Sequence, residues 1–263
     1  MPSRRMTLRN TFNQVAAAYD KARSGYPDAL FADLKKAANL GPNSRLLEVG
    51  CGTGKATVPM ARVGAHTTAI DIGPKMLKFA AKKCAKFKNV AFQQVSFEDF
   101  DGEPGSFDLI YFATSAHWIK PSLLREKCAK LLKTGGHVAI MQHLKLRDKS
   151  PLRRALSKLH REIVPDLQKP PQSKKSPERR VADMTANLAK NGRYAKAVVS
   201  HYPMTTDYTA KEYTALLGTV SYYIHLRKET RKKLFAKMEK VIPAHGGATE
   251  REDCVLILGR KKR

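Results

Sequence analysis

The chain has 263 residues, and 49 lysines and arginines against 23 aspartates and glutamates give it a formal net charge of +26. This length can bury one large α/β core, or one core with a modest cap, and 42% hydrophobic residues suit a globular protein. The sequence lacks the roughly 20-residue apolar run that a membrane span needs, so we expect a cytoplasmic protein without a membrane partner.

The net charge predicts attraction to polyanions and to anionic small molecules. The basic clusters are not interleaved with aromatic residues, as they would be in a platform that stacks bases. Charge alone gives only non-specific affinity. Nucleic acid is therefore an open alternative as a partner but is not favoured, and a host proteome of basic composition would explain the charge equally well.

The cysteine spacing matches neither a zinc site nor a disulfide scaffold, and it favours a reduced compartment without a metal site. The four cysteines are Cys51, Cys84, Cys128 and Cys254.

The first 40 residues predict two helices. Phe12, Val15, Ala16 and Tyr19 recur at the spacing of one helix face, within a helical lead over 1–30. Ser24-Gly25-Tyr26-Pro27 breaks this helix. A second helix then runs from Asp28 to Leu40.

From residue 45 the chain alternates short apolar runs with helical segments. This alternation predicts a parallel, doubly wound sheet, in which ligands bind outside the carboxyl ends of the strands. Strands are expected at 45–49, 66–70, 90–95, 108–113 and 137–142, and helices at 54–63, 74–87 and 121–133.

After Met141 the chain becomes rich in lysine, arginine and proline up to about residue 180. We expect helices at 151–163, 178–191, 209–224 and 228–242, and strands at 195–206 and 254–259. The loop 168–178 is the segment predicted to be most mobile.

A glycine-rich turn follows the first predicted strand, in Leu46-Leu47-Glu48-Val49-Gly50-Cys51-Gly52-Thr53-Gly54-Lys55-Ala56-Thr57. Glycines at 50, 52 and 54 let the backbone adopt positive φ and approach a ligand, and the following helix offers free N–H groups. The turn is not a Walker A motif, because Ala56 follows Gly54-Lys55, and it is not G-x-G-x-x-G, because the third glycine comes one residue early.

With an acid two positions before the first glycine, this stretch resembles the signature of class I S-adenosylmethionine (SAM) methyltransferases, from Leu46 to Met141. Three further motifs resemble trans-aconitate-type and related small-molecule methyltransferases of the type 11 group. They are Tyr19…Ser24-Gly25-Tyr26-Pro27, Ser115-Ala116-His117-Trp118-Ile119 and Tyr213…Leu216-Leu217-Gly218-Thr219-Val220-Ser221.

The resemblance implies a Rossmann-like sheet of seven strands, the last antiparallel, with a helical cap inserted around strand six. It divides the chain into an N-terminal lid (1–40), a SAM-binding core (41–142), a basic cap insertion (143–194) and a completion of the core (195–263) that carries cap helices at 209–242.

The resemblance also implies SAM as cofactor, with S-adenosylhomocysteine as its product. Asp71 would take both ribose hydroxyls, or else only precede the helix at Pro74; Met76 would pack on adenine or belong to the core. Ser96 stands where the family more often has Asp, which shifts the adenine contact toward Phe97 N–H and Glu98. The predicted cofactor residues are Glu48, Gly50, Cys51, Gly52, Gly54, Asp71, Ile72, Met76, Ser96, Phe97, Glu98, Ala113 and Tyr19.

The acceptor is expected to approach after the fourth strand. His117 is the candidate catalytic residue, as a base or a hydrogen-bond donor, or else a structural histidine before Pro121. His143 is a second candidate base, and a Tyr-rich cap would form the ceiling or simply pack. The predicted acceptor pocket consists of Tyr26, His117, Trp118, His143, Tyr202, Tyr213, Ser221 and Tyr222.

We therefore expect in-line methyl transfer from SAM to a small molecule, by O-methylation of a carboxylate or another anionic oxygen. One alternative is an RNA or protein methyltransferase, although Phe112-Ala113-Thr114-Ser115 is unlike the Asn-Pro-Pro-Tyr type of motif used on amines. The other alternative is a SAM-binding protein without catalysis. The chain is expected to be a monomer or a homodimer.

Overall fold

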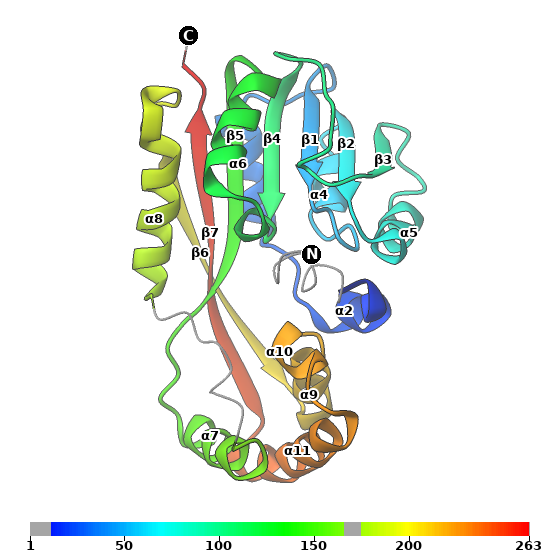
Figure 1. Ribbon diagram of the computed structural model, residues 1–263, viewed down its shortest axis with the longest axis vertical. Helices are drawn as coiled ribbons and strands as arrows, with labels where there is room; N and C mark the ends of the chain where they lie inside the picture. Colours follow the sequence, from blue (N-terminus) through cyan, green and yellow to red (C-terminus); the bar gives the residue numbers. More distant parts are fainter. Residues whose placement is uncertain (1–11, 166–174, 263) are drawn as a thin grey trace.

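A seven-stranded sheet in the order β3-β2-β1-β4-β5-β7-β6 forms the centre of the computed structural model, which describes residues 12–165 and 175–262 (Figure 1). Strands β1 to β5 pair in parallel, and β7 runs antiparallel to both of its neighbours. The predicted fold class, including the antiparallel last strand, is confirmed. The strands are β1 (Arg45–Val49), β2 (His66–Asp71), β3 (Val90–Gln94), β4 (Phe107–Ala113), β5 (Leu132–Lys145), β6 (Val198–Tyr208) and β7 (Ala248–Arg260).

The helices begin where the sequence provides start signals. Proline occupies the first turn of α5, α6, α7 and α8, where its missing N–H is not needed. Ser150 and Ser176 cap α7 and α8 by accepting from backbone N–H groups. The helices are α2 (Ala16–Ala22), α3 (Asp28–Ala37), α4 (Thr57–Ala61), α5 (Pro74–Lys83), α6 (Pro121–Leu131), α7 (Pro151–Ile163), α8 (Pro177–Ala189), α9 (Ala210–Gly218), α10 (Ser221–Ile224) and α11 (Lys228–Val241). None within the described ranges is both long and apolar enough to cross a membrane.

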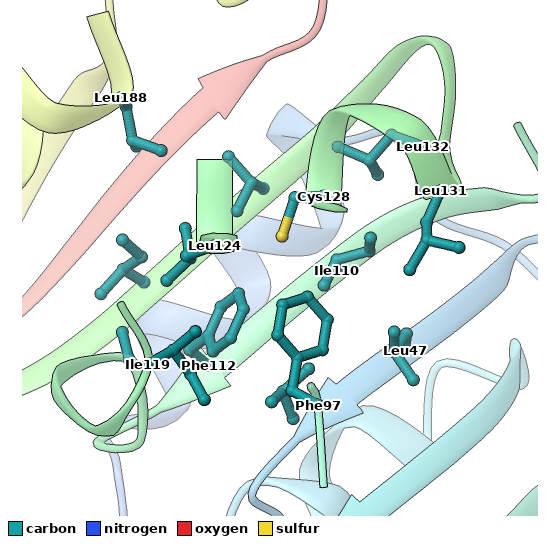
Figure 2. Packing of buried hydrophobic residues seen from close by; sticks show 14 of the residues in the cluster. Leu47, Phe97, Ile110, Phe112, Ile119, Leu124, Cys128, Leu131, Leu132 and Leu188 are labelled. Atoms are coloured by element: carbon teal, nitrogen blue, oxygen red, sulfur yellow. The ribbon is translucent and has the colours of Figure 1, made fainter. Parts of the chain in front are cut away.

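The main apolar core packs one face of the sheet against α6 (Figure 2). Phe97 and Phe112 meet edge to face with their ring centroids 5.6 Å apart, beside the fully buried Cys128. Leu188 of α8 belongs to the same core. The α8 helix therefore covers the sheet, although the sequence groups it with the basic cap.

Strands β5 and β7 extend further than their apolar patterns predict. Their pairing continues through His143 opposite Cys254 to Lys145 opposite Glu252, where charged residues hide the strand signal. In Figure 1, β6 and β7 run past the parallel strands toward α7, α9 and α11. This extension brings polar residues of β5 and β7 close to the carboxyl edge of the sheet.

One further predicted helix is interrupted in the structure, and one predicted loop lies mostly outside the described residues. The single helix predicted at 209–224 is two helices, because Val220 between them has an extended backbone (φ −86°, ψ 129°). The mobile loop predicted at 168–178 and the start of the helical lead lie largely outside the described residues.

Candidate active site

The glycine-rich turn after β1 has all three glycines at positive φ, with values of 72° at Gly50, 55° at Gly52 and 84° at Gly54. A Cβ atom at Gly50 would lie 2.7 Å from the Cβ of Ser115, and one at Gly54 would lie 3.1 Å from the Cα of Ala80. A Cβ at Gly52 would meet no atom within 4 Å. The first and third glycines therefore permit close packing, whereas the backbone at Gly52 faces open space.

Asp71 at the end of β2 holds this turn. Its Oδ2 accepts from the backbone N–H of Gly52 at 2.9 Å, and its Oδ1 accepts from that of Gly73 at 2.8 Å. An ionised carboxylate has about four acceptor positions, which is the chemistry that hydroxyl groups of a ligand require.

A first cavity of about 220 Å³ opens beside Asp71. Ile72, Met76 and Phe97 give it an apolar wall, and Ser96 adds a hydroxyl. At its mouth Phe12 meets the rings of Tyr19 and Trp118 edge on, at centroid distances of 5.8 and 5.9 Å. The predicted residues that line this cavity are Tyr19, Gly50, Gly52, Asp71, Ile72, Met76, Ser96, Phe97, Ala113, His117 and Trp118.

A second cavity of about 90 Å³ adjoins the first at the other side of the glycine turn. The two cavities share the lining residues Tyr19, Arg23, Gly50, Gly52, Ala113 and Thr114. Of the predicted residues, Tyr26, Cys51 and His143 line only the second cavity. Thr114, where the two meet, is a non-glycine residue at a φ of 55°, a strained backbone of the kind found at functional sites.

An imidazole and a carboxylate form a pair in the wall of the second cavity. His143 Nδ1 lies 3.1 Å from Glu252 Oε2, and both side chains are more than four-fifths buried. The ring of Tyr26 lies against His143 with centroids 4.7 Å apart, and the Tyr26 hydroxyl is 2.7 Å from Thr114 Oγ1. Burial acts to raise the pKa of Glu252, but the hydrogen bond and charge of His143, with the charge of Lys145, hold it below its ordinary value.

Arg23, which lines both cavities, links the N-terminal segment to Thr219 at the end of α9. Its Nε donates to Thr219 Oγ1 at 2.9 Å and its Nη2 to the Thr219 carbonyl at 3.3 Å, while the guanidinium lies over the ring of Tyr19. Burial raises the pKa values of Tyr19 and Tyr26, so both phenols stay protonated at neutral pH.

Several predicted cofactor residues lie outside both linings. Glu48 is fully buried and accepts from the Tyr111 hydroxyl, Gly54 packs on α5, and Glu98 is exposed. They stay predictions as cofactor contacts.

The predicted ceiling residues do not belong to the linings of these two cavities. Tyr202 donates to Asp33 Oδ2 on α3 at 2.7 Å, and Ser221 and Tyr222 belong to α10. Tyr213 faces a separate cavity among the cap helices. Val220, with its extended backbone, separates α9 from α10, so Ser221 and Tyr222 do not continue the helix in which Leu216 lines the second cavity.

Sequence reasoning missed Phe12, Lys145, Tyr208 and Glu252 as lining residues. No local signal marks them, because Lys145 and Glu252 occur in charge-rich stretches and become neighbours only through the antiparallel register of β5 and β7.

Taken together, the two cavities fit a nucleoside joined to an amino acid. Asp71 supplies acceptors for ribose hydroxyls and the apolar wall suits a flat base. The open backbone at Gly52 leaves room for a chain that passes from one cavity to the other.

Comparison with known proteins agrees with this geometry. Residues 47–140 match the family model described as "Methyltransferase domain". The demethylmenaquinone methyltransferase of Tropheryma whipplei is 31% identical over 142 residues, which cover 51% of this chain and 58% of that protein. The ubiquinone biosynthesis O-methyltransferase of Xanthomonas campestris pv. campestris is 40% identical over 98 residues, covering 36% and 41%. The chain thus spans about half the length of the curated relatives it matches.

Solved structures share the fold over a longer range. A putative type II methyltransferase from Anaeromyxobacter dehalogenans superposes with a TM-score of 0.62 at 21% identity, covering 92% of this chain and 97% of that one. Phosphoethanolamine N-methyltransferase 2 from Haemonchus contortus, in complex with SAM, superposes with a TM-score of 0.57 at 17% identity, covering 100% and 61%. The chain therefore carries, over residues 47–140, a class I SAM-dependent methyltransferase domain of the type 11 group.

Proposed function

We propose that this protein transfers a methyl group from SAM to an acidic hydroxyl of a small anionic molecule. The observation that carries the proposal is the His143–Glu252 pair in the wall of the second cavity. The sequence favours a carboxylate or another anionic oxygen as acceptor. A carboxylate needs no base, so a buried imidazole–carboxylate pair favours an oxygen that must first lose a proton, such as a phenol or an enol.

The chain's residues divide into donor and acceptor sides. On the donor side, Asp71 would hold the ribose hydroxyls, and the N–H groups of the glycine turn would face the methionine part. When bound, SAM would supply a methyl group on a cationic sulfur, and the sulfur can leave when an oxygen anion attacks the methyl carbon. Tyr19 and Phe12 would exclude water from the adenine side.

On the acceptor side, Glu252 orients His143. When the Nδ1–H group of the neutral imidazole donates a hydrogen bond to Oε2, the basic lone pair of the ring lies on Nε2. The acceptor's O–H bond would break with its proton passing to Nε2, which leaves the oxygen anion as nucleophile. Glu252 would stabilise the resulting imidazolium, and Tyr26 would shield it from water.

The charges around the second cavity support an anionic acceptor. Arg23, Lys55 and Lys145 line it, against the single carboxylate of Glu252. The names of the curated relatives, which refer to menaquinone and ubiquinone, also support a small-molecule acceptor and, for one of them, an oxygen.

The first experiment is a methyl-transfer screen with radiolabelled SAM over phenols, enols, carboxylic acids and RNA. We expect label in hydroxyl acceptors. Label in RNA alone would favour the RNA methyltransferase alternative. SAM binding without transfer to any acceptor would favour a binding protein.

The second experiment compares three histidines. His143→Ala should lower kcat by at least about a hundredfold, the usual worth of a general base, with unchanged SAM affinity. His201→Ala is the matched control, because His201 pairs with Asp253 at 2.6 Å on the exposed side of β6. His117→Ala tests the other predicted base, whose exposed side chain lines only the donor cavity. A loss with His117→Ala and none with His143→Ala would contradict our assignment.

A further inference from the structure

A third cavity lies among the cap helices. It measures about 390 Å³, more than either cavity of the candidate active site, and α7, α9, α10 and α11 surround it. Figure 1 shows these helices gathered beyond the far ends of β6 and β7. The volume falls in the usual range for small-molecule sites, roughly 300–1,000 Å³.

The inner lining of this cavity is apolar. Leu156, Leu217 and Met238 line it together with the rings of Tyr213 and Tyr223, and all five side chains are buried. Such a lining suits the hydrocarbon or aromatic body of a ligand.

Arginines of α7 add positive charge to the lining of this apolar cavity. Arg153, Arg154 and Arg161 all line the cavity. Within residues 12–165 and 175–262 none of the three forms an ion pair with a carboxylate, and Arg154 donates only to the Lys149 carbonyl, at 2.7 Å. Among the described residues, these three guanidinium groups of one helix thus have no carboxylate within ion-pair distance.

A buried polar atom also lacks a partner here. His160 lines the cavity and is 7% exposed, and its Nε2 has no hydrogen-bond partner among the described residues. The ring lies 5.4 Å from that of Tyr222 and 6.1 Å from that of Tyr223, which hold it in place. Leaving such a nitrogen unpaired destabilises the folded protein, and a hydrogen bond to a ligand's polar head would remove that cost. Burial, and then the charge of Arg153, lower the pKa of His160.

We propose that this cavity binds an anionic amphiphile, a molecule with one carboxylate or phosphate head on an apolar body. The head would lie against Arg153 and His160, and the body would fill the space between α9 and α11. This proposal is independent of the proposed methyl transfer.

The site is separate from the active site but adjacent to it. In α9, Leu216 lines the second cavity while Tyr213 and Leu217 line the third. Tyr213 donates to Glu250 Oε1 at 3.0 Å, and the same oxygen is 2.9 Å from Nζ of Lys145, which lines the second cavity. A ligand in the third cavity would therefore contact the helix that closes the acceptor side without occupying it.

The test is calorimetric titration of the full chain with decanoate. We expect saturable binding that persists with saturating S-adenosylhomocysteine, and no comparable binding of decyltrimethylammonium, which has an alkyl chain of similar length and the opposite charge. Arg153→Gln should weaken decanoate binding about tenfold or more, since it removes a charged hydrogen bond. Lys158→Gln removes the same charge from an exposed position of α7 that does not line the cavity, and it should leave the affinity unchanged.

Two outcomes would overturn the proposal. Equal affinity of the Arg153→Gln and Lys158→Gln proteins would show that decanoate binds elsewhere, and displacement by S-adenosylhomocysteine would place it in the active site. Leu217→Trp, which fills the cavity from α9, provides a second variant that should abolish binding. Binding to phosphatidylglycerol vesicles without binding of free decanoate would replace the enclosed site by adsorption to a lipid surface.

Discussion

Tyr111 donates a hydrogen bond of 2.9 Å to Oε2 of Glu48, and the two residues are directly opposite each other in strands β1 and β4. Both side chains are fully buried. Burial raises the pKa of Glu48 to about 8, although the hydrogen bond from Tyr111 opposes the shift. The acid that precedes the glycine turn is therefore a protonated core residue at neutral pH.

This relationship predicts how stability depends on pH. An unfolded Glu48 loses its proton near pH 4.5 and the folded one near pH 8, so the folded state binds more protons between these values. The free energy of unfolding contributed by this group must fall as pH rises through that window. Glu48→Gln stays neutral, so its stability relative to the parent should increase from pH 5 to pH 8 by a few kcal/mol.

Urea unfolding at pH 5 and pH 8 measures this difference. Glu103→Gln is the control, because the Glu103 side chain is 73% exposed and pairs with Arg45 at 3.6 Å, and its stability relative to the parent should shift little between the two pH values. Parallel stability curves for Glu48→Gln and the parent would show that Glu48 is ionised in the fold.

Asp71→Asn tests the ribose contact. The amide has one acceptor oxygen in place of two, so it can no longer serve Gly52, Gly73 and a ligand's hydroxyls together. We expect SAM affinity to fall by roughly 10- to 100-fold, the worth of a charged hydrogen bond, as measured by calorimetry. Asp101→Asn changes an exposed acid outside both cavities and should bind SAM normally. Unchanged affinity of Asp71→Asn would remove Asp71 from the ribose site.

The glycine turn and the position of Asp71 were largely predictable because their signals are local. The positive φ values at Gly50, Gly52 and Gly54 and the position of Asp71 after β2 follow from short motifs in consecutive strand–turn–helix units. The parallel pairing of β1 to β5 follows from the same alternation of strands and helices, whereas the antiparallel last strand was implied by the family resemblance.

The acceptor side was not predictable in the same way, because it depends on contacts between distant segments. Glu252 meets His143 through an antiparallel register that runs into charged residues, where no apolar pattern marks a strand. The extended backbone at Val220 redirects α10, and periodicity across 209–224 does not reveal it. Arg23 reaches Thr219 across 196 positions of sequence.

The glycine turn allows two alanine substitutions to be compared. Gly50→Ala would place its Cβ 2.7 Å from that of Ser115, whose hydroxyl donates to the Val49 carbonyl and cannot easily move. It should lower the melting temperature strongly. Gly52→Ala has a similar positive φ but no atom within 4 Å, so its stability cost should be only that of the left-handed backbone, roughly 1–2 kcal/mol.

The two variants should rank in the opposite order for SAM affinity, once the affinity is corrected for the fraction of folded protein. The new methyl group of Gly52→Ala would occupy the space where the two cavities meet, so it should weaken SAM binding at least about tenfold at a temperature where the protein is folded. Thermal scans with calorimetry separate the two effects. Normal SAM affinity of Gly52→Ala would mean that the donor does not pass this point.

Arg23 connects the N-terminal segment to α9, and its removal should open the site rather than unfold the protein. Arg23→Lys keeps the charge near Tyr19 but loses the paired donors that reach the hydroxyl and carbonyl of Thr219. We expect the dissociation rate of SAM in stopped-flow experiments to rise about tenfold, with a melting temperature close to that of the parent. Thr219→Val removes the hydroxyl that accepts from Arg23 and donates to the Leu216 carbonyl, but keeps the Thr219 carbonyl as an acceptor, so it should show a smaller increase of the same kind. Lys21→Arg, at an exposed position of α2 just before Arg23, should leave the dissociation rate unchanged. A parental dissociation rate in Arg23→Lys would mean that the segment does not limit exit from the donor cavity.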